Sequence, residues 1–283
     1  MAYWFVGTSP CALGEARQKL TTSQPPTVSV VIPTCGTSML VGGIPQILVI
    51  ELLKSFSDEV NALHEIVVVV DAHTPQEVTD ALAELPKVVL ESFNEPFNFS
   101  KKCNAGARRA TGDIILFLND DMLAKSTGWV AEIQQQFNNP SVGGVGGLLL
   151  TPEGLVQCAG HANAPRPHIY GGGKDPKDPA FQEQLMATRE VGGLSGACFA
   201  VRRVDYIEVG GMCEELPSSY NDVDLGFKLK ELGKKLTYVP SIQFVHYESI
   251  SRDPAVGEEE TALIWRRWGR YFEHDPFAPF LPQ

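Results

Sequence analysis

The chain has 283 residues, of which 43% are hydrophobic and 20% are charged, as in an ordinary globular protein with a large core. Its net charge of -11 argues against nucleic acid or an anionic membrane as a main partner, because both repel negative charge. The six cysteines form no Cys-x-x-Cys pair, no apolar run approaches a membrane helix, and residues 1–10 lack a basic start, so metal clusters, spans and signal peptides are not expected.

The first half of the chain predicts alternating strands and helices after an N-terminal extension over residues 1–26. Apolar β-branched runs indicate buried strands, and apolar residues at helical spacing indicate helices between them. In chain order we expect a strand over 28–32 stopped by Pro33, a helix over 44–56, a strand over 65–70, a helix over 75–85, a strand over 88–90, a helix over 100–110 capped by Ser100, and a strand over 114–118. This alternation predicts an α/β fold with a mostly parallel sheet.

The second half of the chain is less regular. We expect strands over 142–150, 197–201, 237–239 and 242–245, and helices over 221–232 and 258–272. Residues 151–180 carry many glycines and prolines and predict a long excursion, which in compact domains often serves as a lid or binding loop. Trp265 and Trp268 are spaced for one face of the last helix, where core packing is favoured over stacking on a sugar.

Polar side chains follow three of the predicted parallel strands. Thr34, Asp71 and the pair Asp120-Asp121 each stand at a strand end, and ligands of such sheets bind at that edge. Mg²⁺ binds through one or two carboxylates together with substrate phosphates. We therefore expect Asp121 to bind a metal ion and Asp120 or Asn119 to contact a sugar or ribose, although a polar turn would give the same pattern.

Other charged residues have two interpretations each. Asp71 could accept hydrogen bonds from a nucleotide base or ribose, or it could cap the next helix. Lys101 or Lys102 could neutralise a phosphate, or both could lie on a solvated helix face. His246 could complete a metal shell or contact phosphate, and Arg252 could bind a diphosphate with two hydrogen bonds, but structural and surface roles are also common for these residue types.

Two acids open the predicted helix over 221–232. Asp222 and Asp224 are two residues apart and therefore point to different faces of the helix. One can face a cleft while the other forms a structural pair. We assign Asp222 the role of a general base, which must come within hydrogen-bond reach of the group that it deprotonates.

Taken together, the motifs resemble family 2 glycosyltransferases of the GT-A fold over roughly residues 27–276, most closely the bacterial branch that builds O-antigens and rhamnan-type chains. The matching motifs are Val-Ser-Val-Val-Ile-Pro-Thr at 28–34, the strand-end acid at 71, Phe-Asn-Phe-Ser at 97–100, Asn-x-Gly-Ala at 104–107, the Leu-Asn-Asp-Asp form of the DXD metal motif at 118–121, Gln-x-x-Gly at 157–160, Asn-Asp-Val-Asp-Leu at 221–225 and His-x-Glu-Ser-x-Ser-Arg at 246–252. Each motif alone is unspecific, but their number, order and spacing together are specific.

The resemblance implies a single compact domain with a Rossmann-like central sheet flanked by helices. It implies inverting transfer from a nucleotide diphosphate sugar, with Asp222 as base and with Asp121 and His246 as ligands of Mg²⁺ or Mn²⁺. Residues at the matched motifs would bind the donor nucleotide, namely Pro33, Thr34, Asp71, Lys101, Asn104, Asn119, Asp120 and Arg252.

The same resemblance implies a UDP- or dTDP-sugar donor and a glycan or lipid-linked acceptor, in cell-surface polysaccharide synthesis. The enzyme would be cytoplasmic and would meet a lipid-linked acceptor at the inner membrane face. Residues 27–256 would form the glycosyltransferase domain, with a nucleotide-sugar-binding half over 27–125 and an acceptor-binding half over 126–256, followed by a C-terminal helix and tail over 257–283.

Three other classes are weighed against this one. A catalytically silent nucleotide- or carbohydrate-binding subunit of a polysaccharide assembly would keep the nucleotide site but displace Asp222. A sugar nucleotidyltransferase would need a Gly-rich, basic loop after the first strand, and no Lys or Arg stands between Thr34 and Lys54. A glycoside hydrolase also uses two carboxylates but does not explain a nucleotide site at the strand ends.

Overall fold

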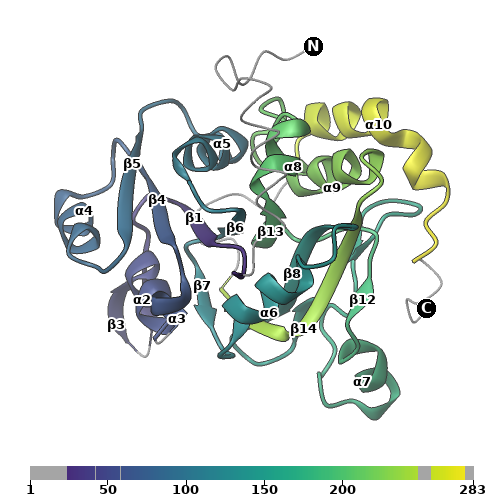
Figure 1. Cartoon of the computed structure of the whole chain (residues 1–283), viewed down its shortest axis with the longest axis horizontal. Coiled ribbons are helices and arrows are strands. Elements are labelled where there is room, and N and C mark those ends of the chain that lie inside the picture. Colours follow the sequence, from purple (N-terminus) through teal and green to yellow (C-terminus); the bar gives the residue numbers. More distant parts are fainter. Residues whose placement is uncertain (1–23, 42, 58, 248–255, 278–283) are drawn as a thin grey trace.

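The computed structural model describes residues 24–41, 43–57, 59–247 and 256–277, so Arg252 and most of the expected N-terminal extension lie outside the described residues. In this part of the chain, a mixed sheet of ten strands forms the centre of the molecule, with helices on both of its faces (Figure 1). The strands lie in the order β12-β14-β8-β13-β6-β1-β4-β5, with β7 beside β14 and β9 beside β8. This arrangement confirms the predicted α/β class.

The first half supplies the parallel part of the sheet. Its elements are β1 (Val28–Thr34), β2 (Ser38–Val41), β3 (Ile44–Ile47), α2 (Leu48–Ser55), α3 (Glu59–Ala62), β4 (Glu65–Asp71), α4 (Gln76–Ala83), β5 (Val88–Phe93), α5 (Phe99–Arg109) and β6 (Ile114–Leu118). The four predicted strands are present, but β1 continues through Pro33 to Thr34. A proline is tolerated there because pairing with β6 ends at Val31, so β1 has a neighbour on one side only.

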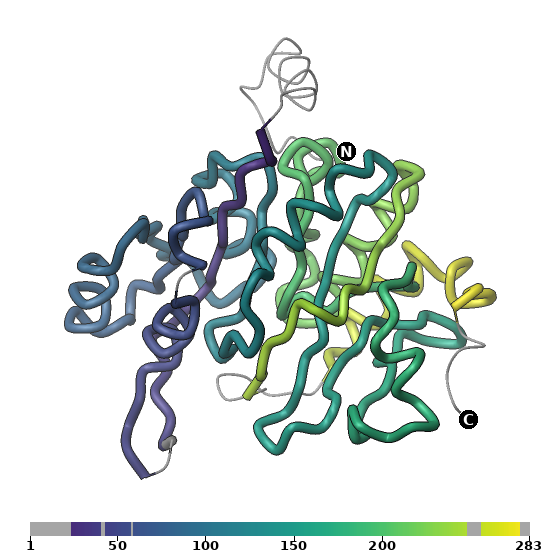
Figure 2. The backbone as a smooth tube through the Cα atoms, turned by 60° about the horizontal axis from the view of Figure 1, so that its bottom comes forward, coloured from purple at the N-terminus to yellow at the C-terminus, as the bar shows by residue number. Residues whose placement is uncertain are grey.

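The predicted helix over 44–56 is wrong in its first turn. Residues 38–47 form an antiparallel hairpin of β2 and β3, and the helix begins only at Leu48. Gly43 precedes β3 with a φ of 83°, a conformation that glycine adopts readily, and two adjacent glycines favour a hairpin turn. The hairpin extends away from the main sheet (Figure 2) and exposes Leu40 and Ile44.

The predicted cap of α5 is also wrong by two residues. Asn98 is the N-cap, because its side-chain oxygen accepts a hydrogen bond from the Lys101 backbone N–H at 2.9 Å. The Ser100 hydroxyl instead donates to the Leu216 carbonyl oxygen at 2.7 Å. Both side chains therefore fix the start of α5 against the second half of the chain, since Asn98 also donates to the Glu214 carbonyl oxygen.

The second half adds the remaining strands and helices. They are β7 (Met122–Ala124), α6 (Trp129–Gln136), β8 (Val142–Leu150), β9 (Val156–Cys158), β10 (His161–Ala162), β11 (His168–Ile169), α7 (Pro179–Leu185), β12 (Arg189–Glu190), β13 (Cys198–Arg202), α8 (Arg203–Glu208), α9 (Asn221–Glu231), β14 (Lys235–His246) and α10 (Glu258–Glu273). The two predicted strands near the end are one strand, β14, with an irregularity between Val239 and Gln243. Short β7 and helix α6 were not predicted, and β13 runs antiparallel to both neighbours.

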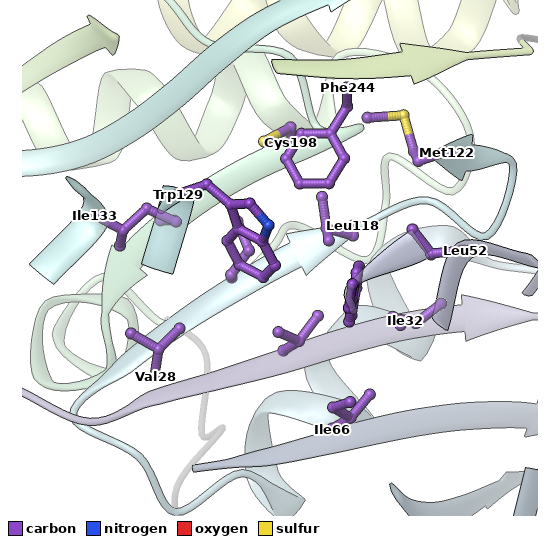
Figure 3. Packing of buried hydrophobic residues seen from close by; sticks show 14 of the residues in the cluster. Val28, Ile32, Leu52, Ile66, Leu118, Met122, Trp129, Ile133, Cys198 and Phe244 are labelled. Carbon is purple, nitrogen blue, oxygen red and sulfur yellow. The ribbon is translucent and has the colours of Figure 1, made fainter. Parts of the chain in front are cut away.

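The sheet has a hydrophobic core on each face. Along β1, Val28, Val30 and Ile32 face one core, in which Trp129 of α6 packs against Phe244 with ring centroids 5.7 Å apart (Figure 3). Val31 faces the other core, which α5 covers. Side chains alternate between faces along a strand, so a strand buried on both sides reads as an unbroken apolar run. This is why the parallel strands were predictable.

A third cluster joins the two helices that lie side by side near the C-terminus, α9 and α10 (Figure 1). Trp268 of α10 is buried against Phe227 of α9, with ring centroids 5.5 Å apart, whereas Trp265 is 45% exposed. The core role expected for the tryptophan pair is therefore confirmed for Trp268. None of the helices in the described part of the chain has the length and apolar character needed to span a bilayer.

Close packing of α5 on the sheet gives a testable expectation at Gly106. A Cβ atom added there would collide with Val31 and lie 2.9 Å from Val69 Cγ2, so Gly106→Ala should destabilise the fold by about 1–3 kcal/mol. Gly269, in α10, is the matched control, because its added Cβ has no atom closer than 3.8 Å. Gly269→Ala should stabilise by roughly 0.5–1 kcal/mol. Chemical denaturation measures both, and a neutral Gly106→Ala would contradict this packing.

Candidate active site

One cavity of about 520 Å³ opens at the carboxyl ends of the parallel strands. Thr34 is the last residue of β1 and Asp71 is the last residue of β4, whereas Asp120 and Asp121 come just after β6. All four residues line this cavity. The expectation that these residues converge on one edge is therefore confirmed. Asp222, at the start of α9, lines the same cavity from the second half of the chain.

The ends of β1 and β6 are tied together by a buried hydrogen bond. The Thr34 hydroxyl donates to Asp120 Oδ2 at 2.6 Å and accepts the Gly36 backbone N–H at 2.9 Å. Burial raises the pKa of Asp120 to about 6, and the hydrogen bond from Thr34 opposes that rise. Asp120 is therefore a carboxylate whose charge depends on what binds beside it.

Pairing of β7 with β14 brings Asp121 next to His246. Met122 pairs with His246, and the Tyr247 backbone N–H donates to the Asp121 carbonyl oxygen at 3.0 Å. Asp121 Oδ1 then lies 3.1 Å from His246 Nε2. Both side chains are buried, with 7% and 8% of their surface exposed.

The protonation of His246 follows from its other neighbour. Gln157 Oε1 lies 2.6 Å from His246 Nδ1, and with this oxygen as acceptor the ring proton sits on Nδ1. In the neutral ring Nε2 presents a lone pair toward Asp121 Oδ1, and Asn119 Nδ2 lies 3.4 Å from the same nitrogen. A lone pair that faces a carboxylate oxygen calls for a positive charge between them, which a proton or a metal ion supplies.

The donor set fits a divalent ion that the substrate helps to bind. A carboxylate oxygen and an imidazole nitrogen supply two ligands, and an Mg²⁺-type site normally takes the others from phosphate and water. Within the described residues, no three His, Cys, Asp or Glu side chains converge as a complete protein site. Imidazole suits transition-metal ions better than Mg²⁺, which favours Mn²⁺.

The two acids of α9 have separate environments, as predicted. Asp222 Oδ2 accepts the Gly196 backbone N–H at 2.8 Å, and its Oδ1 accepts the Val223 N–H at 2.8 Å, which fixes the carboxylate at the cavity wall. Asp224 is fully buried away from it. Its Oδ1 accepts hydrogen bonds from Trp268 Nε1 at 2.8 Å and from Arg267 Nε at 2.9 Å.

The backbone just before Asp222 is held by the last helix. Glu260 of α10 accepts the backbone N–H groups of Ser218 and Ser219 at 2.9 and 2.8 Å. Tyr220 follows with a φ of 59°, a conformation that costs a non-glycine residue energy and persists only where the surroundings impose it. The turn that aims Asp222 at the cavity thus depends on α10.

Two histidines line the cavity on the β10–β11 hairpin, and no sequence pattern indicated either of them. His168 Nδ1 lies 2.7 Å from the Arg166 carbonyl oxygen, so Nδ1 carries a proton and donates to that oxygen. Burial lowers the pKa of His161, while the negative charge of Asp222 opposes that shift. His161 Nδ1 is buried without a hydrogen-bond partner in the described structure.

Two of the predicted donor-binding residues do not line the cavity. Lys101 forms an exposed ion pair with Glu95, and its neighbour Lys102 lines the cavity instead. Asn104 is buried behind the site, where its Oδ1 accepts the Tyr206 hydroxyl at 2.6 Å and the Met212 N–H at 2.9 Å. Its side chain ties the turn at Met212 to α5, and it does not line the cavity where a contact with nucleotide was expected.

The other predicted contacts within the described residues do line the cavity. Pro33 and Asn119 lie on its wall, and Asn119 Nδ2 is 3.4 Å from His246 Nε2. The excursion over 151–180 contributes Gln157 as well as the histidine hairpin, in keeping with its expected binding role. Gln157 belongs to a recognised motif, but no pattern in the sequence shows that it would touch His246.

Sequence comparison gives one family and several relatives. Residues 29–210 match Glycosyl transferase family 2. The O-antigen biosynthesis protein RfbC of Myxococcus xanthus is 32% identical over 216 residues, which cover 71% of this chain and 17% of that protein. An N-acetylglucosaminyl-diphospho-decaprenol L-rhamnosyltransferase of Mycobacterium tuberculosis is 33% identical over 130 residues, 41% of each chain. This chain thus spans less than half the length of these relatives.

Solved structures give the same fold at low identity. GalNAc-T7 with UDP, GalNAc and Mn²⁺ aligns with a TM-score of 0.66 and 15% identity, covering 88% of this chain and 49% of that one. The mannosyltransferase PcManGT of Pyrobaculum calidifontis, in complex with GDP-Man and Mn²⁺, aligns with a TM-score of 0.58 and 19% identity, covering 85% and 65%. The expected GT-A fold is confirmed.

The lowered pKa of His161 gives an expected pH dependence of stability. The unfolded chain takes up a proton near the ordinary histidine pKa of about 6.5, which folded His161 resists, so stability should fall as the pH drops through that range. His161→Asn should lose less stability than wild type between pH 7.0 and 5.5 in chemical denaturation. His274→Asn, at an exposed site, controls for loss of an imidazole, and equal losses in all three proteins would contradict the assignment.

Proposed function

The chain belongs to glycosyl transferase family 2, and from this premise we propose that it transfers a sugar, with inversion, from a nucleotide diphosphate sugar to a hydroxyl group of an acceptor. The reaction needs a site for the departing diphosphate and a base for the incoming hydroxyl. Both requirements point to the cavity at the strand ends.

One observation carries the proposal. The pair of Asp121 and His246 and the carboxylate of Asp222 line the same cavity, although they come from the turn between β6 and β7, from β14 and from α9. The first pair leaves a carboxylate oxygen and an imidazole lone pair facing each other, which suits a divalent cation. When bound there, such a cation would act as a Lewis acid for the negative charge of the leaving diphosphate.

Asp222 is the proposed general base. Its two backbone hydrogen bonds hold the carboxylate in place, and each oxygen retains a further lone pair for a substrate hydroxyl. As the acceptor oxygen attacks the anomeric carbon, its proton passes to Asp222, and the bond to the diphosphate oxygen breaks on the opposite face. This in-line geometry accounts for inversion.

The donor nucleotide is proposed to lie along the ends of β1, β4 and β6. Thr34, Asp71 and Asp120 offer hydrogen-bonding groups on this edge. Pro33 and Asn119 complete the same wall, whereas Arg252 lies outside the described residues and keeps its proposed role with the diphosphate only as a prediction. On this view residues 27–125 form the nucleotide-sugar-binding half and 126–256 the acceptor-binding half.

The wider role rests on the relatives. RfbC is named for O-antigen biosynthesis and the mycobacterial relative for rhamnosyl transfer to a lipid-linked sugar, so we propose surface-polysaccharide synthesis, a UDP- or dTDP-sugar donor and a glycan or lipid-linked acceptor. We place the enzyme in the cytoplasm, against the inner membrane face. Its five described cysteines are free thiols, as expected in a reducing compartment.

The alternatives are less well supported. A silent binding subunit predicts a displaced Asp222, but this residue lines the cavity beside the proposed cation pair. A nucleotidyltransferase predicts a basic glycine-rich loop after β1, whereas that stretch forms the uncharged β2–β3 hairpin.

Nucleotide binding should depend on a divalent ion through Asp121. With Mn²⁺, the best binder among UDP, dTDP and GDP should stabilise the wild type by about 2.7 kcal/mol at 100-fold excess over its dissociation constant. EDTA or Asp121→Ala should remove the Mn²⁺-dependent part, because the carboxylate ligand is lost. Asp80→Ala, an exposed acid on α4, is the control. A Mn²⁺-dependent thermal shift that survives in Asp121→Ala would sink the proposed cation site.

The rate of sugar transfer should depend on Asp222 more strongly than the affinity for nucleotide does. Asp222→Asn keeps the shape of the side chain but cannot take a proton, so the rate of nucleotide release with acceptor present should fall by roughly 10²–10⁴-fold. The affinity for nucleotide with Mn²⁺ should stay within about twofold of wild type. Asp175→Asn, an exposed acid of the 151–180 excursion, should leave both unchanged. Full transfer by Asp222→Asn would rule out its role as base.

A further inference from the structure

Lys102 is a buried cation in the proposed donor site. Among the residues that the structure describes, it is the only lysine or arginine lining the cavity, and it is 3% exposed. It stands on α5 beside Lys101, whose ammonium group pairs with exposed Glu95 instead. A buried ammonium group is costly unless its N–H groups find good partners, so the contacts of Lys102 identify what it is placed to hold.

The partners of Lys102 are two neighbouring strand ends. Its Nζ lies 2.9 Å from Asp71 Oδ1 at the end of β4 and donates to the Thr34 carbonyl oxygen, also at 2.9 Å, at the end of β1. The Thr34 hydroxyl continues the connection to Asp120 at the end of β6. A continuous polar chain therefore crosses the three strand ends that form the donor edge.

This arrangement determines how Asp71 meets a ligand. The lysine occupies Oδ1, and Oδ2 has no partner among the described residues, with 22% of the side chain exposed. The ion pair thus leaves one carboxylate oxygen, in a fixed direction, to accept a hydrogen bond from the ligand. Phe99, three residues before Lys102 on the same helix face, also lines the cavity and adds an aromatic surface to it.

We propose that Lys102 is a positioning residue for the donor nucleoside, which holds Asp71 so that Oδ2 accepts an N–H of the base or an O–H of the ribose. The inference rests on the proposed function, since it assumes that a nucleotide occupies this cavity. Lys102 acts through Asp71 and needs no contact with the phosphates.

The test measures the affinity of a nucleotide diphosphate in the presence of Mn²⁺ by calorimetry. The nucleotide is the one among UDP, dTDP and GDP that stabilises wild type most. Lys102→Met, which keeps the chain length but removes the charge, should weaken binding about tenfold, equivalent to about 1.4 kcal/mol. The adjacent control, Lys101→Met, should bind as wild type does, because its ammonium group does not reach the cavity.

A double-mutant cycle separates positioning from simple charge. Asp71→Asn should also lose about tenfold, and adding Lys102→Met to it should change the affinity by less than about twofold, because the carboxylate to be positioned is already gone. The double variant removes both charges of the pair and leaves neither uncompensated, so we expect it to fold even if Lys102→Met alone does not, and its comparison with Asp71→Asn still decides the question. Additive losses would overturn the inference and make Lys102 an independent cation for the phosphates.

The remaining outcomes are also distinct. Unchanged affinity in Lys102→Met, with normal binding by wild type, overturns this inference and leaves the proposed function standing. No binding of any of the three nucleotides by wild type overturns the proposed function and the inference with it. Nucleotide analogues with a methylated base N–H or without a ribose hydroxyl identify the group that donates the hydrogen bond to Asp71. The affinity of the analogue that lacks this group should no longer change in Lys102→Met.

Discussion

The site depends on three residue pairs of antiparallel sheet between β7 and β14. This short pairing places Asp121 against His246, although the two lie far apart in the sequence. β14 is itself held by its long parallel pairing with β8, and Gln157 reaches His246 from β9, which pairs with the C-terminal end of β8. The geometry of the proposed cation pair is therefore built by the strands of the second half, whereas the nucleotide edge is built by the parallel strands of the first.

The parallel strands and their polar ends were predictable because burial on both faces leaves a strong sequence signal. The strands end in polar residues at Thr34, Asp71 and Asn119, and topology alone brings these ends together. The pattern could not distinguish Lys101 from Lys102, because the two lysines are adjacent in the first turn of α5 and only the folded chain shows which of them is buried. Nor could it distinguish a motif residue that contacts ligand from one, such as Asn104, that ties a turn in place.

Other features escaped prediction because they depend on distant partners. Residues 44–47 have helix-compatible spacing, but the adjacent glycines and Pro45 favour the hairpin that forms. β7 has only three residues, and it forms a strand because it pairs with β14. The histidines of the β10–β11 hairpin lie in a segment without periodicity, so only the folded chain reveals that they line the same cavity as Asp222.

The contact between α9 and α10 limits where this chain can be divided or joined to another domain. The match to the family model ends at residue 210, before the helix that bears Asp222 and before His246. Yet Glu260 fixes the turn into α9, and Trp268 and Arg267 hold Asp224 inside it. The stretch that the family model matches is thus smaller than the unit that must stay together. A fusion point placed between residues 210 and 273 would separate α9 from α10, and the turn that carries Asp222 would lose its support.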